Sequence, residues 1–241
     1  MGSEMCIRDR VSLLSFFKGV RSSPFGASLP PVVPNFTGRQ GECEEIIRHV
    51  SSASTRLVSM WGSPGFGKTS VAIAVAHALQ SQGLPVYWVS LRGVVFKADL
   101  ASKFLSFLRK PTTTKPPSGQ RLSIDEEVRQ LFSDVSKPSA FILDNFDDLL
   151  ESGSPNAKEE VMQLLEEILG RNQMLMFVVT TRESLEYMDL HFQGHKGLRI
   201  RPLDKASAMT LVSELLPNAS AADCTQVAQI CGQVPLAVKL R

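Results

Sequence analysis

An eight-residue segment at positions 62–69, Gly-Ser-Pro-Gly-Phe-Gly-Lys-Thr, constrains the fold of this chain more than any other feature. It fits the pattern GxxxxGK[ST], follows an apolar stretch with the character of a strand, and opens a stretch with the character of a helix. Its three glycines let the backbone turn so that N–H groups point inward, and the helix dipole adds positive potential at the same place. The segment therefore predicts a phosphate-binding loop within an α/β fold, against the alternative of a glycine-rich turn without a ligand.

Short apolar stretches alternate with helix-like stretches up to about residue 203. The predicted strands are 56–61, 85–91, 139–143, 174–180 and 198–201, and the predicted helices are 68–82, 98–109, 155–169 and one that begins at Ser123. This alternation is typical of a mostly parallel sheet covered by helices on both faces. Two consecutive helices without an intervening strand are then expected at 204–216 and 220–231. The predicted fold class is α/β: a three-layer P-loop NTPase fold with a mostly parallel sheet, followed by the start of a small helical domain.

Composition divides the chain into four parts. Residues 1–20 form a leader, and its positions 4–10 resemble the translated adapter of a sequencing library, so the first ten residues are expected to be an assembly artefact. Residues 21–35 contain four prolines and are expected to form a linker. The phosphate-loop domain is expected over 36–203 and a partial helical domain over 204–241. Because the chain stops inside an apolar, helix-like stretch, a fragment of a longer protein is expected.

Composition also excludes several classes of protein. Of the 241 residues, 43% are hydrophobic, and 26 Lys and Arg residues nearly balance 24 Asp and Glu residues. The first value excludes a disordered chain, and the second disfavours a dedicated nucleic-acid-binding protein. No apolar run approaches the roughly 18 residues of a membrane-spanning helix. Four cysteines without a CxxC pair favour a reduced compartment, so a cytoplasmic location is expected.

Two of the histidines, His191 and His195, have the i, i+4 spacing of a helical zinc site. However, Gly194 lies between them, and no glutamate follows His191 as the zinc-binding helix pattern requires. The sequence therefore favours exposed loop histidines over a zinc site.

Three residues at and beyond the loop indicate the chemistry of its ligand. Lys68 supplies a full positive charge for β- and γ-phosphates, and the Thr69 hydroxyl supplies one oxygen ligand for Mg²⁺. A second oxygen ligand is expected from Asp144, because it ends an apolar strand and ligands of parallel sheets bind at the carboxyl ends of strands. An aspartate that only caps a turn is the alternative for that residue.

Polar residues after the later strands give candidates for hydrolysis and for phosphate sensing. Asp147 or Asp148 could orient or deprotonate a water molecule, whereas Asn145 cannot act as a base. A solvated acidic loop is an equally compatible interpretation of these acids. Arg182 follows the next strand and is predicted to sense a γ-phosphate, against the alternative of a surface arginine.

Several motifs stand in order around the loop: FTGR at 36–39, FILDNFDD at 141–148, VVTTRES at 178–184 and GQVPLA at 232–237. Together they resemble the NB-ARC (AP-ATPase) domain of the STAND class of P-loop NTPases, over roughly residues 34–241. The resemblance implies binding of ATP and ADP with Mg²⁺. It also implies a switch in which ADP holds a closed state, and exchange for ATP opens it and permits oligomerisation.

The resemblance assigns roles to individual residues as well. It implies that segment 36–39 lies against the adenine and ribose, that Arg182 is the family's sensor arginine, and that Pro235 packs on the adenine from the helical domain. The predicted nucleotide-binding residues are Phe36, Gly38, Arg39, Gly62, Pro64, Gly65, Phe66, Gly67, Lys68, Thr69, Ser70 and Pro235. The predicted catalytic residues are Lys68, Asp144, Asp147 and Arg182, and the predicted Mg²⁺ ligands are Thr69 and Asp144.

Departures from the family pattern set the expected activity and partners. Asn145 stands where the family often has a second acid, which predicts slow or absent ATP hydrolysis. The family's winged-helix region, sensor repeats and effector domain are not in this sequence. Protein partners are therefore expected to act through those other parts, and the fragment is expected to be a monomer of a protein that can oligomerise.

Three other functions are alternatives to this switch. An active AAA+-type ATPase that remodels nucleic acid or protein would have an acid at position 145 and a basic channel, and neither is evident. A GTPase is disfavoured because the sequence has no NKxD motif. A small-molecule kinase would need a phosphoacceptor pocket and lid arginines, which the sequence does not identify. Neither nucleic acid nor a membrane is an expected partner.

Overall fold

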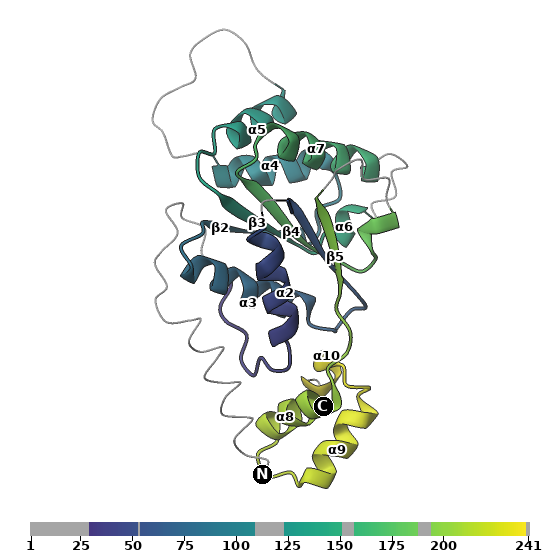
Figure 1. The fold of residues 1–241 in the computed structure, drawn as a ribbon. Coiled ribbons are helices and arrows are strands. Elements are labelled where there is room, and N and C mark those ends of the chain that lie inside the picture. The colour runs from purple at the N-terminus through teal and green to yellow at the C-terminus, as the bar shows by residue number, and fades with distance from the viewer. Residues whose placement is uncertain (1–28, 53, 109–122, 151–156, 188–193, 240–241) are drawn as a thin grey trace.

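A computed structural model describes residues 29–52, 54–108, 123–150, 157–187 and 194–239, and Figure 1 shows their fold. The predicted leader, most of the predicted linker and His191 lie outside the described residues. Within the described ranges, no helix combines the length and the apolar character needed to cross a membrane.

Five parallel strands form a single sheet. The strands are β1 (Leu57–Trp61), β2 (Val86–Ser90), β3 (Ser139–Asp144), β4 (Leu175–Thr181) and β5 (His195–Arg199). Their order across the sheet is β2-β3-β4-β1-β5, and every neighbouring pair is parallel. The predicted parallel sheet is therefore confirmed. Since β4 lies between β1 and β3, the phosphate loop after β1 and the carboxylate that ends β3 flank the end of β4.

Helices cover both faces of the sheet and make the three predicted layers (Figure 1). One face carries α2 (Gln40–Val50) and α3 (Lys68–Ser81), and the other carries α4 (Lys97–Leu108), α5 (Ile124–Ser133) and α7 (Ala157–Arg171). Successive side chains of a strand point to opposite faces, so Phe141 joins the core under α4, α5 and α7, while Ile142 joins the core under α2 and α3. Both cores exclude water, and each fully buried large side chain contributes about 1.5–3 kcal/mol to folding.

The two cores differ in the size of their side chains. Beneath α4, α5 and α7, the ring of Phe132 packs edge-on against Phe141 and Phe177, with centroids 5.1 and 6.0 Å apart. On the other face, eight residues of α3 are buried, and six of these eight are alanine or valine. Small side chains let α3 lie close to the sheet and to α2, which fixes the position of its first residue, Lys68, at the end of β1.

The helix α2 was not predicted. Its apolar residues Cys43, Ile46, Ile47 and Val50 recur at the i, i+3, i+4, i+7 spacing of an amphipathic helix, so the signal is present in the sequence. Two short elements were also missed, α6 (Asp147–Leu150) and the 3₁₀ turn η1 (Leu185–Tyr187). Helix α6 begins directly after the polar residues that follow β3, so those residues lie in a turn with defined geometry.

The described end of the predicted linker lies on the domain. Leu29 packs against the core under α2 and α3. The carbonyl oxygen of Pro30 lies 2.8 Å from Nε2 of His77, a residue of α3. The chain that follows passes the start of α3, because Val33 and residues 35–37 line one pocket together with Gly67 and Ser70.

A C-terminal helical segment (residues 204–239) follows β5 and forms α8 (Lys205–Leu215), α9 (Ala221–Ile230) and α10 (Pro235–Lys239). Asp204 is the N-cap of α8, and its carboxylate accepts a hydrogen bond from the Ser207 N–H. Ser220 forms a capping box with Asp223 at the start of α9. The segment has its own small core, which includes Leu203, Leu211, Val212, Cys224 and Val238.

The last strand starts earlier than predicted, at 195 instead of 198, and this places His195 in β5. The expectation that His195 is an exposed loop histidine was therefore wrong. The side chain is half-buried, and its Nε2 lies 2.7 Å from Oγ of Ser59 on the neighbouring strand β1. Gly194, Lys196 and Gly197 made the start of this edge strand look like a loop. Among the described residues, no cluster of three or more His, Cys, Asp or Glu side chains is arranged to hold a metal ion.

The environment of His195 predicts a pH dependence of stability. Burial lowers the pKa of His195 below its ordinary value, and Lys196 adds to this effect while Glu186 opposes it. The unfolded chain therefore takes up a proton that the folded chain resists, so the stability contributed by neutral His195 is present above about pH 6.5 and is lost as the pH falls below that value. The melting temperature is expected to drop between pH 7.5 and 5.5, and to drop less in His195→Gln. Equal drops in both proteins, measured by calorimetry, would contradict this assignment.

Candidate functional site

The phosphate loop lies between β1 and α3, as predicted, and Lys68 points back into it. Nζ of Lys68 donates to the carbonyl oxygens of Gly62 and Ser63, at 2.6 and 3.2 Å. Burial lowers the pKa of Lys68, while the nearby carboxylates of Asp147 and Asp144 act in the opposite direction. The loop thus holds a partly desolvated cation at the start of a helix, and this arrangement favours the binding of an anion.

Asp144 lies within hydrogen-bond distance of the loop. Its Oδ1 accepts hydrogen bonds from Oγ1 of Thr69 at 2.9 Å and from Oγ1 of Thr180 at 2.8 Å. Burial raises the pKa of Asp144, and these hydrogen bonds partly offset that effect. Two hard oxygen atoms from separate elements therefore lie together, and this donor set fits Mg²⁺. The residues predicted as Mg²⁺ ligands, Thr69 and Asp144, would hold the ion through these two oxygens.

Asp147 has a structural environment that the sequence did not indicate. It is 5% exposed, and its Oδ1 accepts hydrogen bonds from the backbone N–H of Arg182 and, at 2.9 Å, from Oγ1 of Thr181. Its Oδ2 lies 3.9 Å from Nε of Arg182, whose side chain is 48% exposed. The structure thus uses Asp147 to hold the end of β4 and the predicted sensor arginine. That geometry does not favour the role of a water-activating base.

The other two polar residues after β3 also have backbone roles. The carboxylate of Asp148 accepts a hydrogen bond from the N–H of Gly93, at 2.9 Å. Asn145 has a positive φ of 63°, and its N–H donates to Oγ1 of Thr180 at 2.9 Å. An asparagine adopts this left-handed conformation more readily than most residues. The backbone conformation at position 145 therefore favours an asparagine there.

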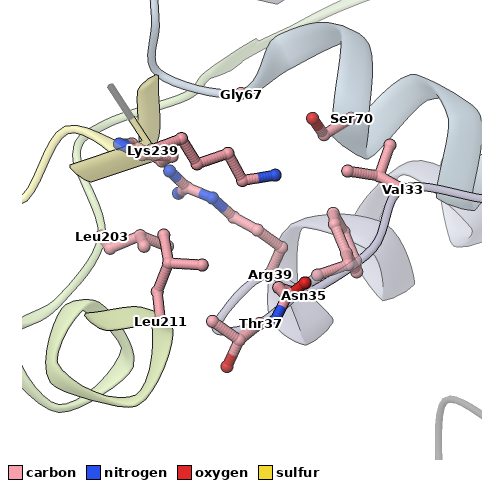
Figure 2. Close-up of a pocket in the computed structure, with 11 residues that line it drawn as sticks. Val33, Asn35, Thr37, Arg39, Gly67, Ser70, Leu203, Leu211 and Lys239 are labelled. Carbon is pink, nitrogen blue, oxygen red and sulfur yellow. The ribbon is translucent and has the colours of Figure 1, made fainter. Parts of the chain in front are cut away.

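A pocket lies beside the phosphate loop, between the domain and the helical segment (Figure 2). Four of its lining residues, Phe36, Arg39, Ser70 and Pro235, belong to the predicted nucleotide-binding set, as does the backbone of Gly67. The remaining lining residues are Val33, Asn35, Thr37, Leu203, Leu211 and Lys239. The walls are mostly apolar near Phe36 and Leu211, whereas Lys239 reaches across the opening toward Ser70 in Figure 2. The pocket thus combines apolar and polar side chains next to the anion-binding loop, as ligand pockets commonly do.

The helical segment touches the phosphate loop directly. The N–H of Leu236, in the first turn of α10, donates to the carbonyl oxygen of Gly65 at 3.3 Å. A Cβ at Gly65 would lie 3.1 Å from the Leu236 side chain and 3.2 Å from Val234, and Gly65 has a φ of +83°. A Cβ at Gly38 would lie 2.2 Å from Oγ of Ser207 on α8. Both predicted glycines are therefore close-approach positions between the domain and the helical segment.

Two further contacts join segment 33–37 to the helical segment. Nδ2 of Asn35 donates to a carboxylate oxygen of Glu214 on α8, at 3.0 Å. Nζ of Lys239 donates to the carbonyl oxygen of Pro34, at 3.4 Å. Six residues at the site were not predicted from the sequence: Thr180, Val33, Asn35, Leu203, Leu211 and Lys239. Thr180 precedes Arg182 at a predicted strand end and could have been found by that position, whereas the others are brought to the site only by tertiary packing.

The loop, the lysine at the start of α3 and the strand-end carboxylate bonded to the loop hydroxyl together define a P-loop NTPase. The chain belongs to the ATPase family associated with various cellular activities (AAA), whose sequence model matches residues 58–191. Membership in this family implies nucleotide binding, typically with Mg²⁺.

Curated relatives match over most of this chain but only a small part of their own length. The chain is 24% identical over 201 residues to the chaperone protein ClpD2, chloroplastic, of Oryza sativa subsp. japonica. This alignment covers 80% of this chain and 19% of that protein. It is 26% identical over 166 residues to an uncharacterized WD repeat-containing protein of Nostoc sp., covering 64% of this chain and 13% of that protein. The chain therefore spans about a fifth or less of the relatives it matches.

Solved structures with the same fold include P-loop ATPases of several kinds. A signal transduction ATPase with numerous domains (STAND) from Pyrococcus horikoshii, which has a tetratricopeptide repeat sensor, superposes with a TM-score of 0.59 at 18% identity, over 91% of this chain and 31% of that one. The Walker-type ATPase of Pyrococcus abyssi gives 0.63 at 14% identity, over 87% and 68%. The Aeropyrum pernix ORC1 protein, solved in complex with DNA, gives 0.52 at 20%, over 88% and 62%. At these identities the likeness supports the P-loop fold alone, and the narrower NB-ARC assignment stays a prediction.

Proposed function

We propose that this chain is the ATP- and ADP-binding module of a STAND-type signalling switch related to the NB-ARC domain. In this function the bound nucleotide sets the position of the helical segment, and exchange of ADP for ATP changes that position and permits assembly of the full-length protein. Hydrolysis is slow or absent, so the device works by shifting a population between two conformations. The effector and sensor parts of the protein, and its partners, lie outside this sequence.

The observation that carries the proposal is the composition of the pocket. Gly67 and Ser70 come from the loop and α3, whereas Leu203, Leu211 and Pro235 come from the connection to the helical segment and from that segment itself. A ligand in the pocket would contact both parts at once. Its affinity would therefore depend on how the two parts are placed, and by linkage the ligand would bias their placement.

The expected low turnover rests on the residues after β3. Asn145 cannot accept a proton from water. The carboxylate of the buried Asp147 already accepts hydrogen bonds from the end of β4. Lys68 and the Asp144–Thr69 pair would still bind a triphosphate and its Mg²⁺, because neither function needs a base.

An active ATPase that remodels protein or nucleic acid is the second candidate. It is favoured by membership in the AAA family and by likeness to a chaperone and to a protein solved with DNA. Steady-state hydrolysis by the full chain separates the two proposals. The switch predicts ATP and ADP binding with little turnover, unaffected by added DNA or unfolded protein. Rapid turnover stimulated by either addition would overturn the switch and support the remodelling ATPase.

The proposed sensor gives a test of nucleotide discrimination. Arg182→Ala is expected to reduce the preference for ATP over ADP by about tenfold, since a hydrogen bond between charged groups contributes about 1.5–3 kcal/mol. ADP affinity should change little, because ADP has no γ-phosphate. Calorimetric titration with each nucleotide provides the measurement. Equal loss of affinity for both nucleotides would contradict the role of Arg182 as a γ-phosphate sensor.

A further inference from the structure

Arg39 is the most deeply buried cation next to the phosphate loop. It is 4% exposed and is the N-cap residue of α2. Its guanidinium donates to the carbonyl oxygen of Phe66 at 2.9 Å, to the carbonyl oxygen of Arg201 at 2.6 Å, and to a carboxylate oxygen of Glu42 at 2.6 Å. One side chain therefore joins the phosphate loop, the start of α2 and the connector (residues 200–203) between β5 and the helical segment.

The hydrogen bond to Phe66 has a consequence for the loop. In a planar trans peptide the C=O and N–H groups point in opposite directions. When Arg39 holds the Phe66 carbonyl on the outside of the loop, the N–H of Gly67 in the same peptide must point away from Arg39. Gly67 is the N-cap of α3, so its N–H is one of the helix-start donors that have no partner within the helix. Those donors are the ones that bind an anion at a helix N-terminus.

The hydrogen bond to Arg201 extends this restraint to the helical segment. The connector is held at both ends: the N–H of Ile200 donates to the Trp61 carbonyl at 2.7 Å, and the N–H of Leu203 donates to the Gln233 carbonyl at 3.0 Å. Gln233 lies just before α10, whose Leu236 contacts Gly65. The Arg39 guanidinium thus lies between the loop and the chain that carries α10. Figure 2 shows this side chain extending from the start of α2 toward the helical segment.

We infer that Arg39 is a positioning residue for phosphate binding, which orients the Gly67 N–H and couples the loop to the connector of the helical segment. This inference rests on the proposed binding of nucleotide phosphates at the loop, and it gives Arg39 a role in addition to lining the base pocket. The bonding atoms on the loop and connector are backbone carbonyls. Nη2 of Arg39 donates to both carbonyls, while Nη1 donates to Glu42. A planar guanidinium holds these three acceptors in one fixed geometry, which a lysine ammonium does not reproduce.

Binding of inorganic pyrophosphate, a probe without a base or sugar, tests the inference. Arg39→Lys and Arg39→Met are expected to weaken pyrophosphate binding by about three- and tenfold, which is the size of effect expected when one oriented hydrogen bond is lost. Arg56→Met is the matched control. Arg56 also donates to backbone carbonyls, those of Leu175, Leu169 and Asn172, but at the opposite end of the sheet. The Arg56→Met substitution should lower the melting temperature and leave pyrophosphate binding unchanged.

Amide hydrogen exchange gives a second readout that does not depend on ligand binding. In Arg39→Lys, exchange is expected to accelerate together in residues 62–67 and 200–203, with α7 unaffected. Unchanged pyrophosphate affinity in both Arg39 variants, or faster exchange spread over the whole domain, would overturn the inference. A wild-type chain that binds no pyrophosphate would overturn it too. Failure of the switch proposal is measured separately, as rapid ATP turnover, and leaves these comparisons intact.

Discussion

Replacement of Lys68 by alanine is expected to weaken the binding of both ATP and ADP by about 10- to 100-fold, because a hydrogen bond to a charged group contributes about 1.5–3 kcal/mol. Nζ of Lys68 lies at the mouth of the loop, 2.6 Å from the Gly62 carbonyl, and burial lowers its pKa by withholding water. A phosphate would supply the negative charge that this partly desolvated cation lacks. Isothermal titration at pH 7.5 in the presence of Mg²⁺ measures the change.

Lys97→Ala is the matched control for this experiment. Lys97 is also partly exposed and is bound to an acceptor, the carboxylate of Asp125, at 2.9 Å, but it lies at the start of α4. Its replacement should leave nucleotide affinity unchanged, and both variants should retain a cooperative melting transition. Wild-type affinity in Lys68→Ala would mean that the loop does not hold the phosphates.

A second large effect is expected from Asp144→Asn. In the presence of Mg²⁺, ATP binding should weaken by about tenfold or more, since the charge stabilisation provided by a bound metal is worth several kcal/mol. In EDTA the variant and the wild type should bind ATP almost equally. The reason is that the substitution removes the negative charge of one proposed ligand of Mg²⁺ while keeping an oxygen that can accept from Thr69 and Thr180.

The same substitution should not destabilise the fold. Burial raises the pKa of Asp144, which means that the charged form is disfavoured inside the protein. Removing that charge is expected to leave the melting temperature of the nucleotide-free protein unchanged or to raise it. Asp134→Asn, at the C-cap of α5, is a control that also removes one carboxylate and should bind ATP normally. A large fall in melting temperature for Asp144→Asn would show that its effect on ATP binding is structural.

The sheet could be predicted from the sequence because its strands are buried on both faces. Such strands are continuous apolar runs, as in Phe141-Ile-Leu, and glycine or polar residues separate them from the helices. Edge elements gave weaker signals. The strand β5 contains Lys196 and Gly197, and α2 has polar residues on most of its surface. For this reason the predicted start of β5 was three residues late, and α2 was not predicted.

The candidate site could be predicted where one residue type carries the chemistry. Lys68, Thr69, Asp144 and Arg182 could be proposed from the sequence because charged and hydroxyl side chains at strand ends and helix starts are typical of phosphate and Mg²⁺ sites. The partners of Arg39 could not be found in this way, because they are backbone carbonyls, and every residue has one. Lys239 is distant in sequence from the loop, and only the packing of α10 brings it to the pocket.

The end of β4 connects the proposed Mg²⁺ ligand Asp144 with the proposed phosphate sensor Arg182. Three successive residues there donate hydrogen bonds to two aspartates. Thr180 donates to Asp144. The Thr181 hydroxyl and the Arg182 N–H both donate to Asp147. A small shift of this strand end would break the hydrogen bonds that position the proposed metal ligand and the proposed phosphate sensor at the same time. Loss of the γ-phosphate and weakening of the metal site would then be a single event, so an intermediate that keeps one and loses the other should be scarce.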